Sequence, residues 1–221
     1  GFVIRNIMGA TWINSQILGV EMGQHTKTSA MKRAARRASF DATKDQKYLQ
    51  YLEDTAKTRN IPIDVPVGGQ ISSGSQYLAY VTRTTGKPTK LAGLRGVFRN
   101  ATDRDWRFFD EIDRSGIAGG GQAQMEVAEK SGLAGTGSWN PFRAHFWPFK
   151  AVRAANTEAE YMVRMTAGRH IMEGGGTLDD AWNGIRKYHF DYSEMTPAEA
   201  RIKMVIPFWK WQKNILPVLV E

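Results

Sequence analysis

Glycine clusters divide this chain of 221 residues into short segments, and this division limits the folds open to it. The 22 glycines gather mainly at 68–74, 116–121, 132–137 and 174–176. Because glycine weakens helices and strands, glycines 119–121 and 174–176 are expected to interrupt the chain, and residues 132–138 to form a loop. Between the clusters, apolar residues recur mostly at helical spacing. The sequence therefore predicts a mainly α fold, in which several helices are joined by Gly/Pro-rich loops and are extended rather than packed around one compact core.

The pattern predicts three successive segments. Residues 1–60 are expected to form an N-terminal helical segment with a basic face, and residues 61–139 a mixed, loop-rich connector. Residues 140–221 are expected to form a C-terminal helical region with a kinked aromatic end. Within the connector, residues 61–67 alternate apolar side chains with prolines, which favours an extended segment over a strand paired in a sheet.

Three local patterns predict the position of a helix or of a helix end. Residues 102–115 predict a helix whose large apolar side chains recur every three residues: Trp106, Phe109 and Ile112. Glycines 174–176 are expected to end a long helix. Thr177 and Asp180 then have the spacing of a capping box, which opens the next helix.

The charge balance points to an anionic partner. Lys and Arg number 30 against 22 Asp and Glu, which leaves a net charge of +8 and a pI near 9.7. Such a chain favours contact with nucleic acid, an acidic protein or lipid headgroups. Four cations are expected on one face of a helix, opposite a face of Met31 and alanines: Lys32, Arg33, Arg36 and Arg37. Two interpretations stay open, a surface that contacts DNA phosphates without reading bases, and a solvated face that keeps the helix soluble.

The densest aromatic stretch lies near the C-terminal end. It predicts a docking element, either for a protein partner or for a membrane surface, where tryptophan and lysine both suit the headgroup region. Its residues are Phe208, Trp209, Lys210, Trp211 and Lys213. Pro207 is expected to bend this helix, so that these aromatic side chains leave the face that the preceding residues bury.

The sequence predicts no enzyme. The absence of cysteine excludes a disulfide framework, a thiolate zinc site, an iron–sulfur cluster and a cysteine nucleophile. His170 and Glu173 have a spacing that suits a metal, but no third ligand lies near them in sequence. The glycine-rich stretches lack the fingerprints of phosphate-binding loops. We therefore expect no catalytic residue, no metal and no cofactor.

Two stretches resemble a segment common in very large proteins of tailed bacteriophages. The first is 187–199, with a Phe-Asp-Tyr-Ser turn followed by Thr-Pro, and the second is 205–217, with a proline–aromatic–tryptophan–lysine–asparagine end. The opening at 1–7 is similar to a Gly-Phe-x-hydrophobic-Arg-Asn start in the same proteins. The resemblance covers 1–20 and 140–221. It departs at Trp209 and Lys210, where those proteins usually have Tyr or Phe and then Thr.

The resemblance implies a structural virion protein, internal to the capsid or tail lumen and ejected with the genome. Expected partners are other virion proteins, namely the portal, the tail or copies of the chain itself, with non-specific DNA contact and transient membrane contact as further expectations. Delivery would end in the host cell envelope or cytoplasm. Two alternatives stay open: a tape-measure-like or tail-tip scaffold, and the non-catalytic part of a larger cargo enzyme. Because the chain starts at Gly1 and is apolar up to Glu221, we also expect it to be a window from a longer polypeptide.

Overall fold

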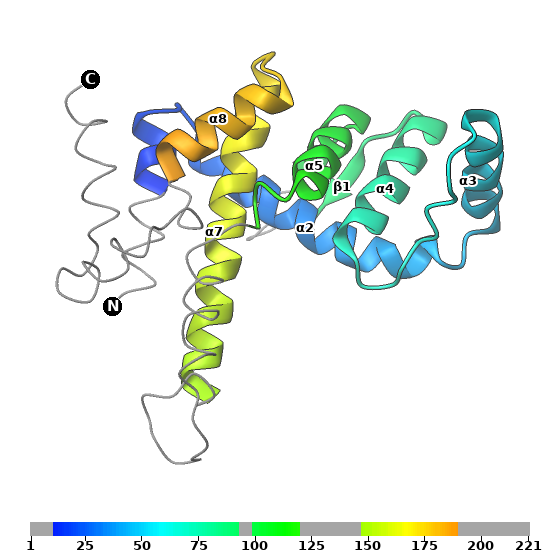
Figure 1. Ribbon diagram of the computed structural model, residues 1–221, viewed down its shortest axis with the longest axis horizontal. Helices are drawn as coiled ribbons and strands as arrows, with labels where there is room; N and C mark the ends of the chain where they lie inside the picture. Colours follow the sequence, from blue (N-terminus) through cyan, green and yellow to red (C-terminus); the bar gives the residue numbers. More distant parts are fainter. Residues whose placement is uncertain (1–10, 93–98, 120–146, 190–221) are drawn as a thin grey trace. The chain divides into compact units, whose positions relative to one another are not determined.

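Helices make up most of the part of the chain that the computed structural model describes, residues 11–92, 99–119 and 147–189 (Figure 1). The predicted mainly α class is therefore confirmed. After a helical stretch at 11–16 the elements follow in this order: α2 (Met22–Ala42), α3 (Gln46–Arg59), α4 (Ile71–Thr85), β1 (Thr89–Leu91), β2 (Arg99–Ala101), α5 (Asp103–Ser115), α7 (Trp147–Glu173) and α8 (Leu178–His189). Among these elements, none is long and apolar enough to cross a bilayer.

The chain divides into two compact units. We call Glu21–Ser115 the central unit. The flanking unit comprises Gly1–Val20 and Gly116–Glu221, of which 11–20, 116–119 and 147–189 are described. The boundaries between the units, after Val20 and after Ser115, fall inside the predicted segments 1–60 and 61–139 and not at their ends.

In the central unit, α2 packs against α4, and α4 packs against α5. Helices α2 and α4 lie close together because Gly74 of α4 has no side chain. A Cβ atom at this position would lie 1.7 Å from the carbonyl oxygen of Ala35 in α2. The core is closed by α5, whose Trp106, Phe109 and Ile112 are all fully buried, as their spacing predicts.

Helix α3 has clear signals at both ends. The Asp45 carboxylate accepts hydrogen bonds from the backbone N–H groups of Lys47 (3.0 Å) and Tyr48 (3.2 Å). Such a cap satisfies donors that have no partner within the helix. Asn60 ends the helix in the left-handed conformation (φ 52°). Residues 61–67 then form neither a helix nor a paired strand, so the expected absence of sheet pairing is confirmed.

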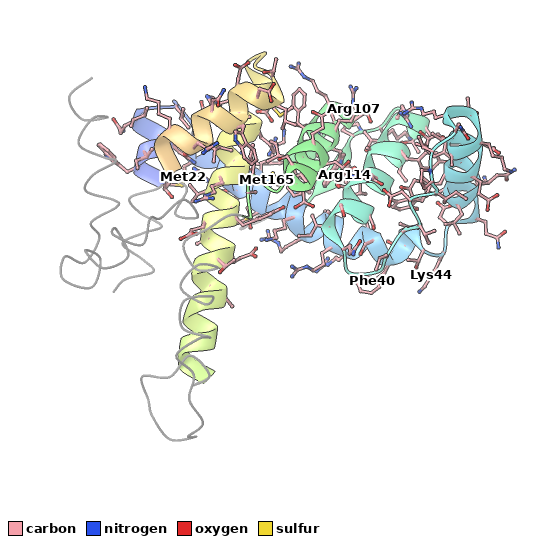
Figure 2. The ribbon with its side chains drawn as sticks, viewed as in Figure 1. Met22, Phe40, Lys44, Arg107, Arg114 and Met165 are labelled. Carbon is pink, nitrogen blue, oxygen red and sulfur yellow. The ribbon has the colours of Figure 1, made fainter. Side chains whose placement is uncertain are left out.

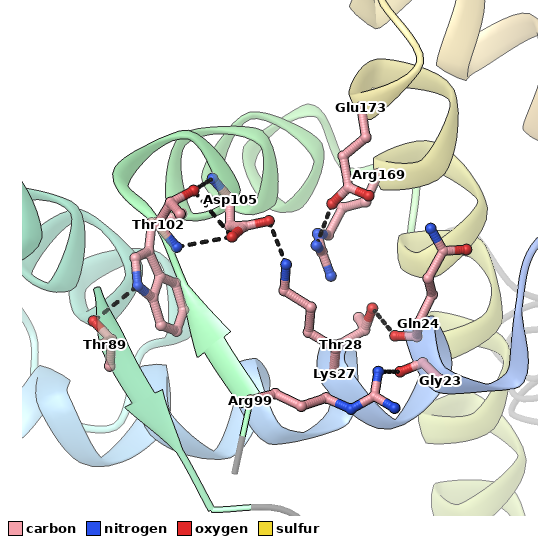
Figure 3. Close-up of polar contacts among 11 residues, drawn as sticks. Gly23, Gln24, Lys27, Thr28, Thr89, Arg99, Thr102, Asp105, Arg169 and Glu173 are labelled. Carbon is pink, nitrogen blue, oxygen red and sulfur yellow. Dashed lines mark hydrogen bonds and ion pairs between the residues drawn. The ribbon is translucent and has the colours of Figure 1, made fainter. Parts of the chain in front are cut away.

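A two-stranded antiparallel hairpin, which the sequence pattern does not predict, precedes α5. Its β1 residue Thr89 accepts a hydrogen bond from the Trp106 indole N–H at 3.1 Å (Figure 3). The start of α5 is held by a reciprocal cap, since Thr102 N–H donates to Asp105 at 2.8 Å and Asp105 N–H donates to Thr102 Oγ1 at 3.3 Å. Lys27 of α2 completes this network with an ion pair to Asp105 at 2.7 Å.

In the flanking unit, α8 lies across α7 (Figure 1). Helix α7 ends at Glu173, directly before glycines 174–176, as predicted. The predicted capping box is also confirmed: Thr177 N–H donates to Asp180 at 2.8 Å, and Asp180 N–H donates to Thr177 Oγ1 at 3.1 Å. Asn14 connects the stretch at 11–16 to α7 through a hydrogen bond to the Val163 carbonyl oxygen at 3.0 Å.

Candidate functional site

Three exposed arginines follow one face of α2: Arg33, Arg36 and Arg37. We call them the arginine face. Arg33 donates a hydrogen bond to Ser29 at 2.8 Å. Arg36 and Arg37 have no side-chain partner among the described residues. Three guanidinium groups on one helix surface are suited to contact several phosphates at once.

The prediction that Lys32 belongs to this exposed face is wrong. Lys32 is buried, with only 7% of its surface exposed. On the helix it shares a face with Thr28 and Ser39, which are also buried. A lysine can occupy a buried position when its aliphatic stem packs against apolar neighbours.

The predicted docking residues lie outside the described residues, and their role stays a prediction: Phe208, Trp209, Lys210, Trp211 and Lys213. The same holds for the resemblance motifs from residue 190 onward and for residues 1–7.

The spacing of His170 and Glu173 does not lead to a metal centre in the described region. Glu173 forms an ion pair with Arg169, one turn earlier on α7. Within residues 11–92, 99–119 and 147–189, no group of three His, Cys, Asp or Glu side chains could hold a metal ion.

A cleft of about 660 Å³ opens in the central unit. It is lined by α3, α4 and α5 and by residues 61–64, which follow α3. Tyrosines from two helices form its aromatic floor, with ring centroids 5.1 Å apart for Tyr48 and Tyr80 and 4.8 Å apart for Tyr51 and Tyr80. Tyr48 is fully buried, whereas the other two are half-buried. We call this feature the tyrosine cleft.

The spacing of four tyrosines is a sequence signal for the tyrosine cleft, separate from the apolar periodicity that predicts the helices. Tyr48 and Tyr51 are three residues apart on α3, and Tyr77 and Tyr80 have the same spacing on α4. Each pair therefore shares one helix face. Only packing of α3 beside α4 brings the two pairs together, and this packing is not encoded in either spacing alone.

One wall of the cleft holds a network of charges. Arg114 of α5 (Figure 2) donates to Asp64 at 2.7 Å and to Asp110 at 3.0 Å. Asp110 also accepts hydrogen bonds from Ser75 at 3.0 Å and Gln76 at 3.3 Å. Burial raises the pKa of the Asp110 carboxyl, although Arg114 and the hydrogen bonds act in the opposite direction. The Asp110 carboxyl in the cleft wall therefore ionises at a higher pH than an ordinary aspartate does.

Two other titratable groups are shifted by their surroundings. Burial, followed by the hydrogen bond to Asp45, raises the pKa of Tyr77 to about 12. Burial lowers the pKa of His25 on α2. Both shifts favour the neutral form, which is expected for groups inside a folded unit.

The chain matches no protein-family model, no curated protein and no solved structure. Function is therefore inferred from the residues themselves. Their arrangement supports two kinds of contact, phosphate binding along the arginine face and stacking with charge pairing in the tyrosine cleft.

Proposed function

We propose that this chain is a structural, non-enzymatic protein of a tailed-bacteriophage virion, held inside the capsid or tail lumen and ejected with the genome. The observation that carries this proposal is the pair of motif stretches at 187–199 and 205–217, together with the opening at 1–7. These stretches resemble segments of large virion proteins in both residue type and order.

The arginine face supports this proposal, because a protein stored inside a virion lies beside closely packed DNA. Arg33, Arg36 and Arg37 are exposed and can neutralise phosphates without reading base sequence. Other virion proteins, namely the portal, the tail or further copies of the chain, are the proposed protein partners.

The absence of cysteine supports passage through a narrow tail. No disulfide can block an unfolded chain of this composition, and helices re-form quickly after transit. Helices dominate the described parts of both units, so much of that structure can be recovered from local contacts.

The test is to locate the chain in particles of the phage that encodes it, with an antibody raised against the central unit. We expect it in purified virions and expect its loss from particles that have released their DNA. Retention in emptied particles at an unchanged amount would replace ejection with a tape-measure-like or tail-tip role. Absence from intact virions would overturn the proposal.

A further inference from the structure

The tyrosine cleft has an excess of positive charge. Three carboxylates line it, and all three pair with two arginines of α5: Arg107 with Asp103 at 3.3 Å, and Arg114 with both Asp64 and Asp110. Two further arginines at the cleft, Arg59 and Arg83, have no carboxylate partner among the described residues. A ligand that completes the charge balance is therefore an anion.

Arg83 is held in place by the aromatic floor. Its guanidinium donates a hydrogen bond to the Tyr51 hydroxyl at 2.8 Å and lies 5.5 Å from the centroid of the same ring. One hydrogen bond leaves most of its five N–H donors for another partner. Arg59 is exposed at the end of α3, and its side chain makes no hydrogen bond or ion pair with the described residues.

The cleft also offers a surface for a flat, unsaturated ring. The half-buried Tyr51 and Tyr80 supply aromatic area, and Leu52, Ile61 and Ile63 supply apolar area around it. The Tyr80 hydroxyl and the Gln76 side-chain carbonyl oxygen have no hydrogen-bond partner among the described residues. At a ring edge the hydroxyl can therefore donate or accept a hydrogen bond, and the carbonyl oxygen can accept one. A simple anion would use the arginines but not this surface, and an uncharged apolar ligand would leave the arginines unpaired.

We propose that the tyrosine cleft binds a nucleotide unit, with the base against Tyr51 and Tyr80 and the phosphate held by Arg59 and Arg83. The same chemistry describes a free nucleotide and one unit of a single-stranded nucleic acid. Base–aromatic stacking tolerates any base, since every base has a π face, so we expect little sequence preference. This inference does not depend on the virion role, because it concerns a cleft inside the central unit and not the motif stretches.

The full chain is tested by fluorescence anisotropy with a short fluorescein-labelled oligodeoxythymidylate. The double variant Arg59→Gln, Arg83→Gln should weaken binding by about tenfold or more, since charge-assisted contacts to phosphate are lost. Tyr80→Leu should weaken it by about tenfold through lost stacking. The matched control Lys44→Gln, Lys47→Gln removes two exposed charges that belong neither to the cleft nor to the arginine face, and should leave most of the affinity.

Competition distinguishes the two sources of the ligand. Displacement of the probe by a mononucleotide identifies a site for the free molecule, and displacement only by unlabelled oligonucleotide identifies a single-strand site; both support the proposal. Equal losses in the cleft and control variants would overturn it, because binding would then follow general charge. Equal displacement by an acidic peptide, or no binding of the probe, would also overturn it. Circular dichroism checks each variant, and if Tyr80→Leu unfolds, the arginine double variant decides.

Discussion

At the scale of single residues, Asp110 shows how burial and pairing compete for one carboxyl group. Three side chains donate to it, and each favours the ionised form. Burial is the larger effect and raises its pKa above the ordinary 3.8. The carboxyl therefore keeps its proton in the folded protein at pH values where the unfolded chain has lost it.

The stability of the fold should reflect this shift. Between pH 3.8 and the raised native pKa, the folded state binds more protons than the unfolded state, so the Asp110 contribution to the free energy of unfolding falls as pH rises. In Asp110→Asn this dependence should disappear. The measurement is urea unfolding of both proteins at a series of pH values. The raised pKa of Asp110 would be contradicted if the difference in free energy of unfolding between wild type and variant stayed constant with pH. It would also be contradicted if wild type gained stability over the variant as pH rises.

At the scale of elements, the contact between α2 and α4 depends on a missing side chain. A Cβ atom at position 74 would lie 1.7 Å from Ala35 O and 2.9 Å from Ser39 N. Both are backbone atoms of α2, so neither can move without displacing the helix. The two helices can approach this closely only because position 74 is glycine.

Gly74→Ala should therefore destabilise the central unit by about 1–3 kcal/mol, the usual penalty for overpacking a core. The matched control is Gly119→Ala, where the nearest atom to a new Cβ is Gly116 O at 3.6 Å, an ordinary contact. Thermal or urea unfolding of the two variants measures the difference. Equal stability of Gly74→Ala and wild type would mean that α2 and α4 separate without penalty.

The arginine face belongs to the same scale, because one helix carries it. With three exposed arginines instead of four cations, the log–log salt slope for duplex DNA should be roughly −2.7. Changing Arg33, Arg36 and Arg37 together to Gln should remove most of this slope. The control changes three exposed lysines elsewhere in the central unit, Lys44, Lys47 and Lys57, and removes the same charge. Equal effects of both triple variants would make the arginine face merely a solubilising surface.

At the scale of the whole molecule, the aromatic stretch after Pro207 is expected to join the chain to its surroundings. Burying one large aromatic side chain contributes about 2–3 kcal/mol, so the double variant Trp209→Ala, Trp211→Ala should reduce docking more than folding. Incorporation into particles and binding to anionic liposomes measure docking, and circular dichroism measures helicity. Lost incorporation identifies a protein partner, and lost liposome binding alone identifies a membrane surface. Loss of helicity with docking intact would make these tryptophans ordinary core residues.

The sequence alone determined the features that depend on near neighbours in the chain. Trp106, Phe109 and Ile112 share a helix face because of the helical repeat, and Thr177 caps α8 with Asp180 because they are three residues apart. The prolines at 62 and 66 similarly predict an unpaired extended segment. Each of these signals acts within one or two turns of chain, so no knowledge of the packing is needed to read it.

The tertiary structure decided everything that depends on which faces meet. Helical spacing places Lys32 beside the arginines, and only the tertiary packing shows that this position is buried. The same packing brings Tyr51 of α3 to Tyr80 of α4 and carries Arg114 to Asp64, 50 residues away in sequence. Such contacts arise from shape and burial between distant segments, which no local period encodes, and without them the tyrosine cleft would not form.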